Sequence, residues 1–138
     1  MPNGIDLILA DHRAVDDLFA KFEATQDGTV IGEVIDKLKA HDDAEQAALY
    51  PLVGHVLADA DLIERSAAAH SAVKKQIDVL GTLEGAPLSD AFRALRAIVE
   101  EHVADEETNL LPRLAEKATP QQLEGLGARI LQAKQRGG

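Results

Sequence analysis

A short pattern with the residue types of a metal site occurs twice in this chain. It reads H-x-x-x-E-[QE]-x-x-L-x-P, and the two copies begin at His41 and His102. On an α-helix, residues four apart lie on the same face, about one turn from each other. Each copy therefore directs an imidazole nitrogen and a carboxylate, that of Glu45 or Glu106, to one point. Brought together in a folded core, the two points predict a site for a pair of metal ions.

The repeat extends towards the N-terminal side of each copy. Residues 10–15 and 68–73 share the pattern A-x-H-x-A-V, which places His12 and His70 at equivalent positions. The chain thus consists of two copies of one unit, a helix with one His followed by a helix with His and Glu. Four imidazoles and two carboxylates suit ions such as iron, zinc, copper or nickel rather than magnesium or calcium. Six side chains are too many for one zinc ion but fit two ions bridged by both carboxylates.

The elements that must position these ligands are helices. Apolar residues recur at helical spacing almost throughout the chain, which predicts an all-α fold. We expect four long helices within residues 4–116 and a short C-terminal fifth helix over about 120–135. Short connections between long helices predict an antiparallel up-down-up-down four-helix bundle, and we expect a single domain over residues 1–138.

Turn and cap signals predict where these helices end. Gly28 is suited to a left-handed cap after the first helix, and the fourth helix is expected to begin at about Ser89. Pro51 disfavours helical geometry at Tyr50, so the second helix is expected to kink or break there. Thr119 opens the sequence T-P-Q-Q, with a cap residue, a Pro in the first turn and a Gln three residues after the cap. This last signal predicts the start of the fifth helix.

The four histidines are predicted to lie at one level of the bundle. In an antiparallel hairpin, residues at equal height are equidistant from the turn. The midpoint between His12 and His41 falls in the predicted turn after the first helix, and that between His70 and His102 falls in the turn before the fourth. Each His also follows the apolar spacing of its helix and so faces the core. Burying two glutamates there without a cation would be costly, which favours a metal site over a metal-free bundle.

With these residues in view, the chain resembles the hemerythrin-like family of HHE cation-binding domains, especially its small stand-alone bacterial members. The resemblance covers residues 4 to about 116 and rests on six motif residues: His12, His41, Glu45, His70, His102 and Glu106. It implies two iron ions in a non-haem centre, with terminal histidines, bridging glutamates and an oxo or hydroxo group between the ions. It also implies that this centre binds O2, NO or peroxide.

One departure from the family affects the expected reaction. Oxygen-carrying hemerythrins have two histidines a turn apart on the third helix, whereas Ser66 and Lys74 stand four residues before and after His70. Without the fifth His, two coordination positions stay open instead of one. We therefore interpret the site as one that disproportionates H2O2 in a catalase-like reaction, with no catalytic residue beyond the metal ligands. The alternative is reversible O2 or NO binding, or an iron-responsive protein without turnover.

Tyr50 is the only tyrosine and follows Glu45 by five residues. On a straight helix it would point about 140° away from Glu45. We therefore interpret Tyr50 as a core or rim aromatic. Because Pro51 makes a straight helix doubtful, the alternative is that Tyr50 ligates a metal ion or donates a hydrogen bond to a bound ligand.

Three further acidic residues lie next to the predicted ligands. Asp42 and Asp105 either accept hydrogen bonds from the imidazoles or lie on solvated helix faces, and solvation is the favoured interpretation. Glu107 could replace Glu106 as a ligand. Glu106 is the better candidate because four residues of helical rotation from His102 bring it closer to the same face.

Bulk properties exclude several classes of function. The formal net charge of -10 disfavours nucleic acid or an anionic membrane as a partner, since both require basic surface. The absence of cysteine excludes disulfides and thiol chemistry. The N-terminus has neither the basic start nor the apolar run of a signal peptide, and no apolar stretch is long enough to span a bilayer. We expect a cytoplasmic monomer whose partner is a small diatomic or peroxide ligand.

Overall fold

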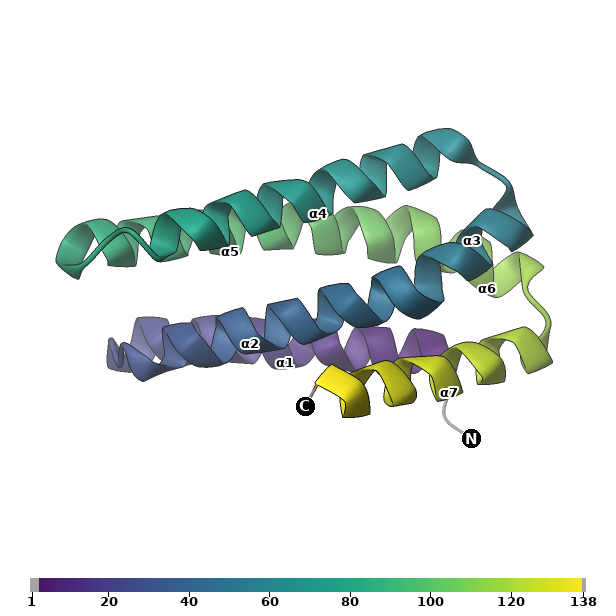
Figure 1. Cartoon of the computed structure of the whole chain (residues 1–138), viewed down its shortest axis with the longest axis horizontal. Coiled ribbons are helices and arrows are strands. Elements are labelled where there is room, and N and C mark those ends of the chain that lie inside the picture. Colours follow the sequence, from purple (N-terminus) through teal and green to yellow (C-terminus); the bar gives the residue numbers. More distant parts are fainter. Residues whose placement is uncertain (1–2, 138) are drawn as a thin grey trace.

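A computed structural model describes residues 3–137, and within that range the chain is helical, with no strand (Figure 1). Two π-helical turns, η1 and η2, make α2–η1–α3 and α5–η2–α6 two continuous long helices. This confirms the predicted all-α bundle with a fifth helix at the C-terminus. The elements are α1 (Gly4–Thr25), α2 (Thr29–Ala44), η1 (Glu45–Leu49), α3 (Tyr50–Leu57), α4 (Ala60–Leu80), α5 (Gly85–Asp105), η2 (Glu106–Leu110), α6 (Leu111–Lys117) and α7 (Pro120–Gly137).

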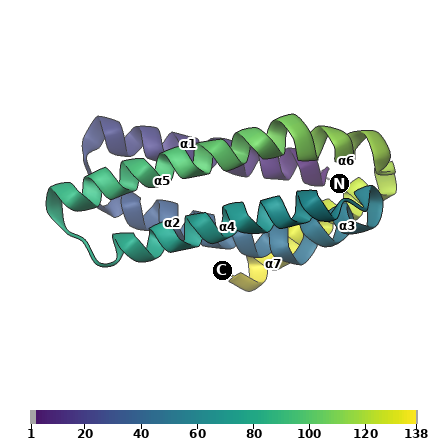
Figure 2. The same cartoon turned by 90° about the horizontal axis from the view of Figure 1, so that it is seen from above.

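The bundle is built from two helical hairpins. α1 pairs with α2, and α4 pairs with α5, as Figures 1 and 2 show from two directions. The C-terminal helix α7 packs mainly against the first hairpin, through α1, α2 and η1. None of the described helices is both long and apolar enough to cross a membrane.

Two apolar clusters form the core, one on each side of the histidine level. In α1, His12 lies between Ile8 of one cluster and Val15 of the other. The cluster near α7 includes Leu49, Val53, Leu62, Leu110, Leu114, Leu126 and Ile130. The cluster near the α1–α2 and α4–α5 turns includes Phe19, Phe22, Val30, Val34, Leu80, Phe92 and Leu95. Aliphatic and aromatic side chains therefore cover the layer that contains the four histidines, both above and below it along the bundle axis.

Two predicted helix ends are wrong by a few residues. The left-handed residue after α1 is Gln26 (φ 53°), not Gly28, which has right-handed helical geometry (φ -61°). The N–H of Gln26 bonds the carbonyl of Phe22, so α1 is already capped before Gly28 is reached. α5 begins at Gly85 rather than at about Ser89, and this first residue has a positive φ of 64°, which glycine adopts without strain.

The chain stays helical through Pro51, so of the two predicted outcomes, a kink or a break, the break does not occur. The turn before it widens instead, and the N–H of Tyr50 bonds the carbonyl of Glu45 five residues back. Proline lacks an N–H and crowds the carbonyl four residues before it, and a π-turn relieves this crowding without ending the helix. The second copy of the repeat behaves alike: the N–H of Leu111, just before Pro112, bonds the carbonyl of Glu106.

The predicted start of the C-terminal helix is confirmed by a reciprocal cap. The N–H of Gln122 donates to Oγ1 of Thr119 (3.1 Å), and the N–H of Thr119 donates to Oε1 of Gln122 (2.9 Å). This is the capping-box arrangement, and it fixes the point at which α7 turns back onto the first hairpin.

Helix α7 packs tightly against α1 at Gly4. A Cβ atom added there would lie 2.3 Å from Cγ of Leu126. We expect Gly4→Ala to lower the free energy of unfolding by about 1–3 kcal/mol, the usual cost of overpacking, as measured by urea denaturation. Gly32→Ala is the matched control, because nothing lies within 4 Å of a Cβ there and alanine favours an exposed helix by about 1 kcal/mol. Equal effects at the two positions would contradict tight packing of α7.

Candidate metal centre

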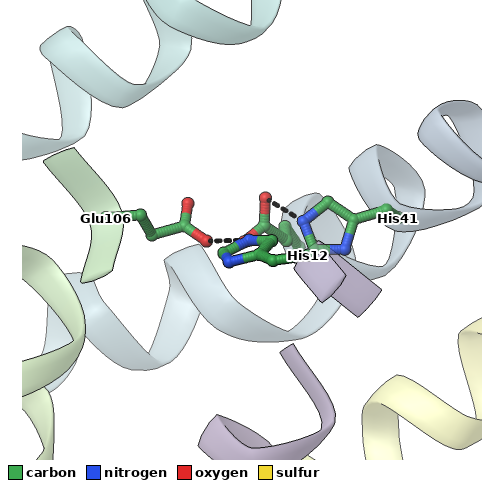
Figure 3. Close-up of side chains that lie close together, drawn as sticks. His12, His41 and Glu106 are labelled. Carbon is green, nitrogen blue, oxygen red and sulfur yellow. Dashed lines mark ion pairs between the residues drawn. The ribbon is translucent and has the colours of Figure 1, made fainter. Parts of the chain in front are cut away.

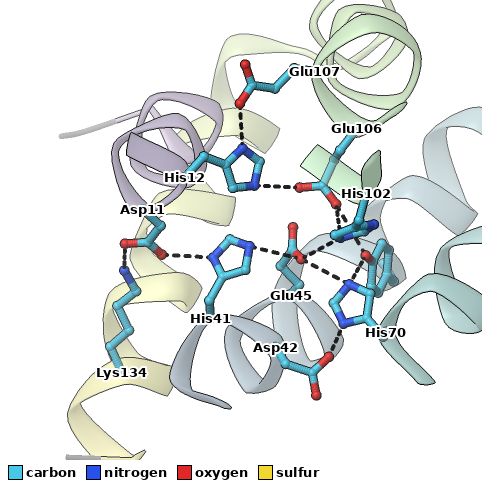
Figure 4. Close-up of polar contacts among 11 residues, drawn as sticks. Asp11, His12, His41, Asp42, Glu45, His70, His102, Glu106, Glu107 and Lys134 are labelled. Atoms are coloured by element: carbon cyan, nitrogen blue, oxygen red, sulfur yellow. Dashed lines mark hydrogen bonds and ion pairs between the residues drawn. The ribbon is translucent and has the colours of Figure 1, made fainter. Parts of the chain in front are cut away.

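The six predicted ligands converge on one level of the bundle (Figure 4). Each long helix supplies one imidazole, and each π-turn supplies a glutamate as its first residue. The side chains are His12 (α1), His41 (α2), Glu45 (η1), His70 (α4), His102 (α5) and Glu106 (η2). All are buried except His102, which is slightly exposed.

These side chains form two overlapping groups, each able to surround one cation. One group is the His12/His41 position, and the other is the His70/His102 position. Glu45 and Glu106 belong to both groups, and in each group four ligand atoms lie within 4.8 Å of one another. This sharing is the arrangement expected of two carboxylates that bridge two ions.

The distances show how each glutamate joins the two positions. Oε1 of Glu45 lies 3.1 Å from Nε2 of His41 and 3.1 Å from Nε2 of His70. Oxygens of Glu106 lie 3.2 Å from Nε2 of His12, as Figure 3 shows, and 3.2 Å from Nε2 of His102. Each carboxylate therefore contacts at least one imidazole of each position.

Most of these atoms are buried without a hydrogen-bond partner. Unpaired polar atoms in a protein core are costly, and a cluster of them is rare. Imidazole nitrogens and carboxylate oxygens directed at shared points are, however, a suitable donor set for cations. The residues therefore fit a metal site. The unpaired atoms are Nε2 of His12, His41 and His102, both carboxylate oxygens of Glu45, and Oε1 of Glu106.

The electrostatics of the cluster favour positive charge. Burial opposes protonation of His41, but the carboxylate of Glu45 and a hydrogen bond to Asp11 outweigh it and raise the pKa of His41 to about 10. Burial likewise opposes protonation of His102, but the nearby carboxylates of Glu106 and Glu45 outweigh it and raise the pKa of His102 to about 9. The pKa of Glu45 is held well below its usual range: burial opposes ionisation, and His41 and the other neighbours of Glu45 outweigh it. The two buried carboxylates are therefore stabilised by positive charge beside them, which can come from protons on the histidines or from metal ions.

Carboxylates behind the imidazoles orient three of the four rings. Nδ1 of His12 bonds Glu107 (2.7 Å), Nδ1 of His41 bonds Asp11 (3.1 Å), and Nδ1 of His70 bonds Asp42. When Nδ1–H donates to a carboxylate, Nε2 carries the lone pair and directs it at the metal position.

The acidic neighbours of the cluster have different roles. Asp42 is an imidazole acceptor, whereas the favoured prediction was a solvated residue. Asp105 lies on a solvated helix face, as the favoured prediction had it, and pairs with Arg65 at the surface (3.0 Å). Glu107 bonds the outer nitrogen of His12, so it supports a ligand and does not replace Glu106. The partner of His41, Asp11, was not predicted; its only sequence signal is that it directly precedes His12 within the repeat.

Tyr50 lies in the cluster, contrary to the favoured prediction of a core or rim aromatic. Its Oη lies 2.5 Å from Nε2 of His70 and 3.4 Å from Oε2 of Glu106. The prediction assumed a straight helix, and the π-turn that starts at Glu45 rotates Tyr50 back towards the ligand face. Because Nδ1 of His70 faces Asp42, Nε2 accepts the hydrogen bond from the phenol. Tyr50 thus occupies the direction in which a cation on His70 would lie.

The repeat shows that the two metal positions are not equivalent. Leu111 stands where the second copy of the pattern matches Tyr50, and it too is the first residue after a π-turn. Leu111 is buried and has no polar group to offer. Only the His70/His102 position therefore has a phenol beside it among the described residues.

A small cavity lies beside the imidazoles. Its volume is about 50 Å³, and all four histidines line it. A single water needs about 10–15 Å³, so the cavity has room for a molecule of a few heavy atoms. The other lining residues are mostly apolar: Val15, Leu38, Lys39, Asp42, Val73, Lys74, Ile77, Val99 and Val103.

The fold and the site together define a helical cation-binding domain, and comparison with known proteins identifies the family. Residues 3–118 match the family described as Hemerythrin HHE cation binding domain. The chain belongs to this family.

A solved structure shows the same fold. It is a Hemerythrin HHE cation binding domain-containing protein from Mycobacterium kansasii, which superposes with a TM-score of 0.87 over 99% of this chain and 88% of that one, at 23% identity. A curated relative, a DNA nickase of Nostoc sp., is 29% identical over 135 residues. That alignment covers 94% of this chain but only 38% of the Nostoc protein, so this chain spans little more than a third of that relative's length.

Proposed function

We propose that the cluster holds two iron ions and that the protein consumes H2O2 in a catalase-like reaction. The single observation that carries this proposal is the set of buried, unpaired imidazole and carboxylate atoms arranged as two positions that share both glutamates. The four histidines would be terminal ligands, and Glu45 and Glu106 would bridge the ions. Mixed imidazole and carboxylate ligands suit iron, and bound iron would supply the electron transfer that peroxide disproportionation requires.

The surroundings of the cluster support a small ligand. The cavity beside the imidazoles is large enough for peroxide or a diatomic molecule and far below the roughly 300–1,000 Å³ of sites for larger organic molecules. Its apolar side chains limit the access of bulk water, and Lys39 and Lys74 are also among its lining residues. These features favour a ligand with two heavy atoms over an organic substrate.

Tyr50 is the residue best placed to assist the reaction. Its Oη can hold a proton or donate one to a molecule bound near His70, or ligate an ion directly. We expect Tyr50→Phe to reduce peroxide consumption by about 100-fold, the lower end of the contribution of a positioned proton donor. Oxygen release measured with an electrode would test this, with metal content as the control for an intact site. Loss of an iron–phenolate absorption band in the variant would identify ligation, and the absence of such a band from the wild type would exclude it. Unchanged turnover would contradict the role as proton donor.

The first experiment is metal analysis together with the optical spectrum of protein purified in air. We expect about two irons per chain, near-ultraviolet bands of an oxygen-bridged pair, and rapid oxygen release from added H2O2. Iron without turnover, with a reversible spectral change under O2 or NO, would favour the alternative of a binding or sensing protein. Absence of iron after growth in iron-replete medium would overturn the proposal, and zinc in its place would indicate a structural site.

The expected partners follow from charge and site size. We propose that the protein acts as a monomer on a small ligand and does not bind nucleic acid, because a net charge of -10 repels a phosphate backbone. The nicking activity in the name of the Nostoc relative is therefore not extended to this chain.

A further inference from the structure

We propose that Lys134, in the C-terminal helix, is a positioning residue for the metal centre and acts through Asp11 on the imidazole of His41. The proposal rests on the metal site of the proposed function. Lys134 lies outside residues 3–118, the part of the chain that matches the family. Figure 4 shows the three side chains in a row, from α7 through α1 to α2.

The carboxylate of Asp11 is held from both sides. Its Oδ2 accepts a hydrogen bond from Nδ1 of His41 (3.1 Å), and its Oδ1 accepts one from Nζ of Lys134. The side chain of Asp11 is largely buried, with 12% of its surface exposed, so water competes little for either oxygen. An acceptor fixed at both oxygens cannot rotate away from the imidazole that it orients.

Packing of α7 brings Lys134 to this point. Leu123, Leu126 and Ile130 form the buried face of the helix and enter the same apolar cluster as Ile8 of α1. Lys134 follows Ile130 by four residues and therefore continues the same face. Two thirds of its side chain is buried, and only the end of its stem reaches the polar level. The ammonium group is thus positioned by the docking of a whole helix.

Among the described residues, a lysine of α7 supports an imidazole at the His12/His41 position alone. His102 is the repeat counterpart of His41, but Ala69 stands at the counterpart of Asp11. Within the described part of the chain, no carboxylate bonds Nδ1 of His102; its contacts with Glu45 and Glu106 are made through Nε2. The influence of α7 on the imidazoles is therefore confined to the His12/His41 position.

A second lysine provides a matched comparison. Nζ of Lys74 lies 3.5 Å from the carboxylate of Asp42, which bonds His70. The side chain of Lys74 is 69% exposed, so its ion pair is long, solvated and weak. Each lysine thus contacts an aspartate that bonds a histidine of the cluster. The side chain of Lys134 is mostly buried under α7, whereas that of Lys74 is mostly exposed to solvent.

Titration of the metal-free protein with Co²⁺, followed by absorption in the visible range and by calorimetry, tests the proposal. The wild-type chain is expected to bind two Co²⁺. Lys134→Met should weaken one of the two binding steps by about 10- to 100-fold, as loss of a group that orients a ligand generally does, and leave the other unchanged. Lys134→Arg should restore most of the affinity, and Lys74→Met should change neither step more than about threefold.

A double-mutant cycle separates positioning from general damage to α7. Asp11→Asn leaves the apolar face of α7 intact and should weaken the same step as Lys134→Met. The double variant should be no weaker than Asp11→Asn alone, because both substitutions interrupt one chain of contacts. Additive losses, equal weakening of both steps, or wild-type binding by Lys134→Met would overturn the positioning role. A wild-type chain that binds no Co²⁺ or iron would instead overturn the proposed metal site itself.

Discussion

Replacing Glu45 by Gln is expected to lower the metal content of the protein from two ions per chain to at most one. Oε1 of Glu45 contacts imidazoles of both positions, His41 and His70, at 3.1 Å each. An amide has one weak donor oxygen and no charge, so it cannot bridge two cations. We expect the affinity for the pair of ions to fall by more than about 100-fold, beyond the usual effect of removing a supporting residue. Metal analysis after dialysis against a fixed free Co²⁺ or Fe²⁺ concentration would measure this loss.

Asp43→Asn is the control for this substitution. It removes one negative charge two residues from Glu45, but Asp43 is exposed and belongs to neither group of ligand atoms. We expect its metal content to equal that of the wild type. Two ions retained by the Glu45 variant would show that the carboxylate does not bridge, and equal losses in both variants would point to net charge as the cause.

Removing the metal ions from the wild-type protein is expected to destabilise the fold by several kcal/mol. Binding to the folded state alone contributes about 4 kcal/mol for each ion when its free concentration is 1,000-fold above the Kd. In this protein the effect should be large, since removal leaves buried nitrogen and oxygen atoms without partners in the core. The difference between urea midpoints with added metal and with a chelator would measure it.

The variant His41→Ala should lose much of this metal-dependent stabilisation. With chelator present, His41→Ala and the wild type should differ far less than they do with metal, because no ion is then lost with the imidazole. Equal midpoints for the wild type with and without metal would contradict a metal-stabilised bundle and would favour a fold that has merely descended from metal-binding ancestors.

The arrangement of the ligands was predictable because the repeat and the helix period both point to one place. His41 and Glu45 are four apart, His102 and Glu106 repeat that spacing, and equidistance from the turns places the histidines at one level. No long-range information was needed. The structure brings all six side chains together.

The position of Tyr50 was mispredicted because the helix period changes locally. A rotation of 100° per residue holds in α2 but not in η1, where the turn closes over five residues. A signal was present in the sequence, since a proline follows both Glu45 and Glu106 by six residues. Two prolines at the same offset, each inside an otherwise helical segment, are better explained by a π-turn in each helix than by two helix breaks.

The contacts behind the ligands could not be read from the sequence. Asp11 and Lys134 are 123 residues apart, and their meeting depends on the angle at which α7 returns to the first hairpin. The residues of α7 predict a helix and its apolar face, but not which helix that face will cover. Acidic residues are also too common in this chain for any one of them to stand out.

Neither half of the chain contains a complete metal position. Each position combines two imidazoles from one hairpin with one glutamate from each hairpin. On the proposed ligand set, each ion therefore clamps the hairpins together, much as a covalent cross-link would. We expect the release of an ion to require the hairpins to part, a motion that would open the other position as well. Exchange of the two ions with solvent should then be one concerted event, as slow as the opening of the whole bundle.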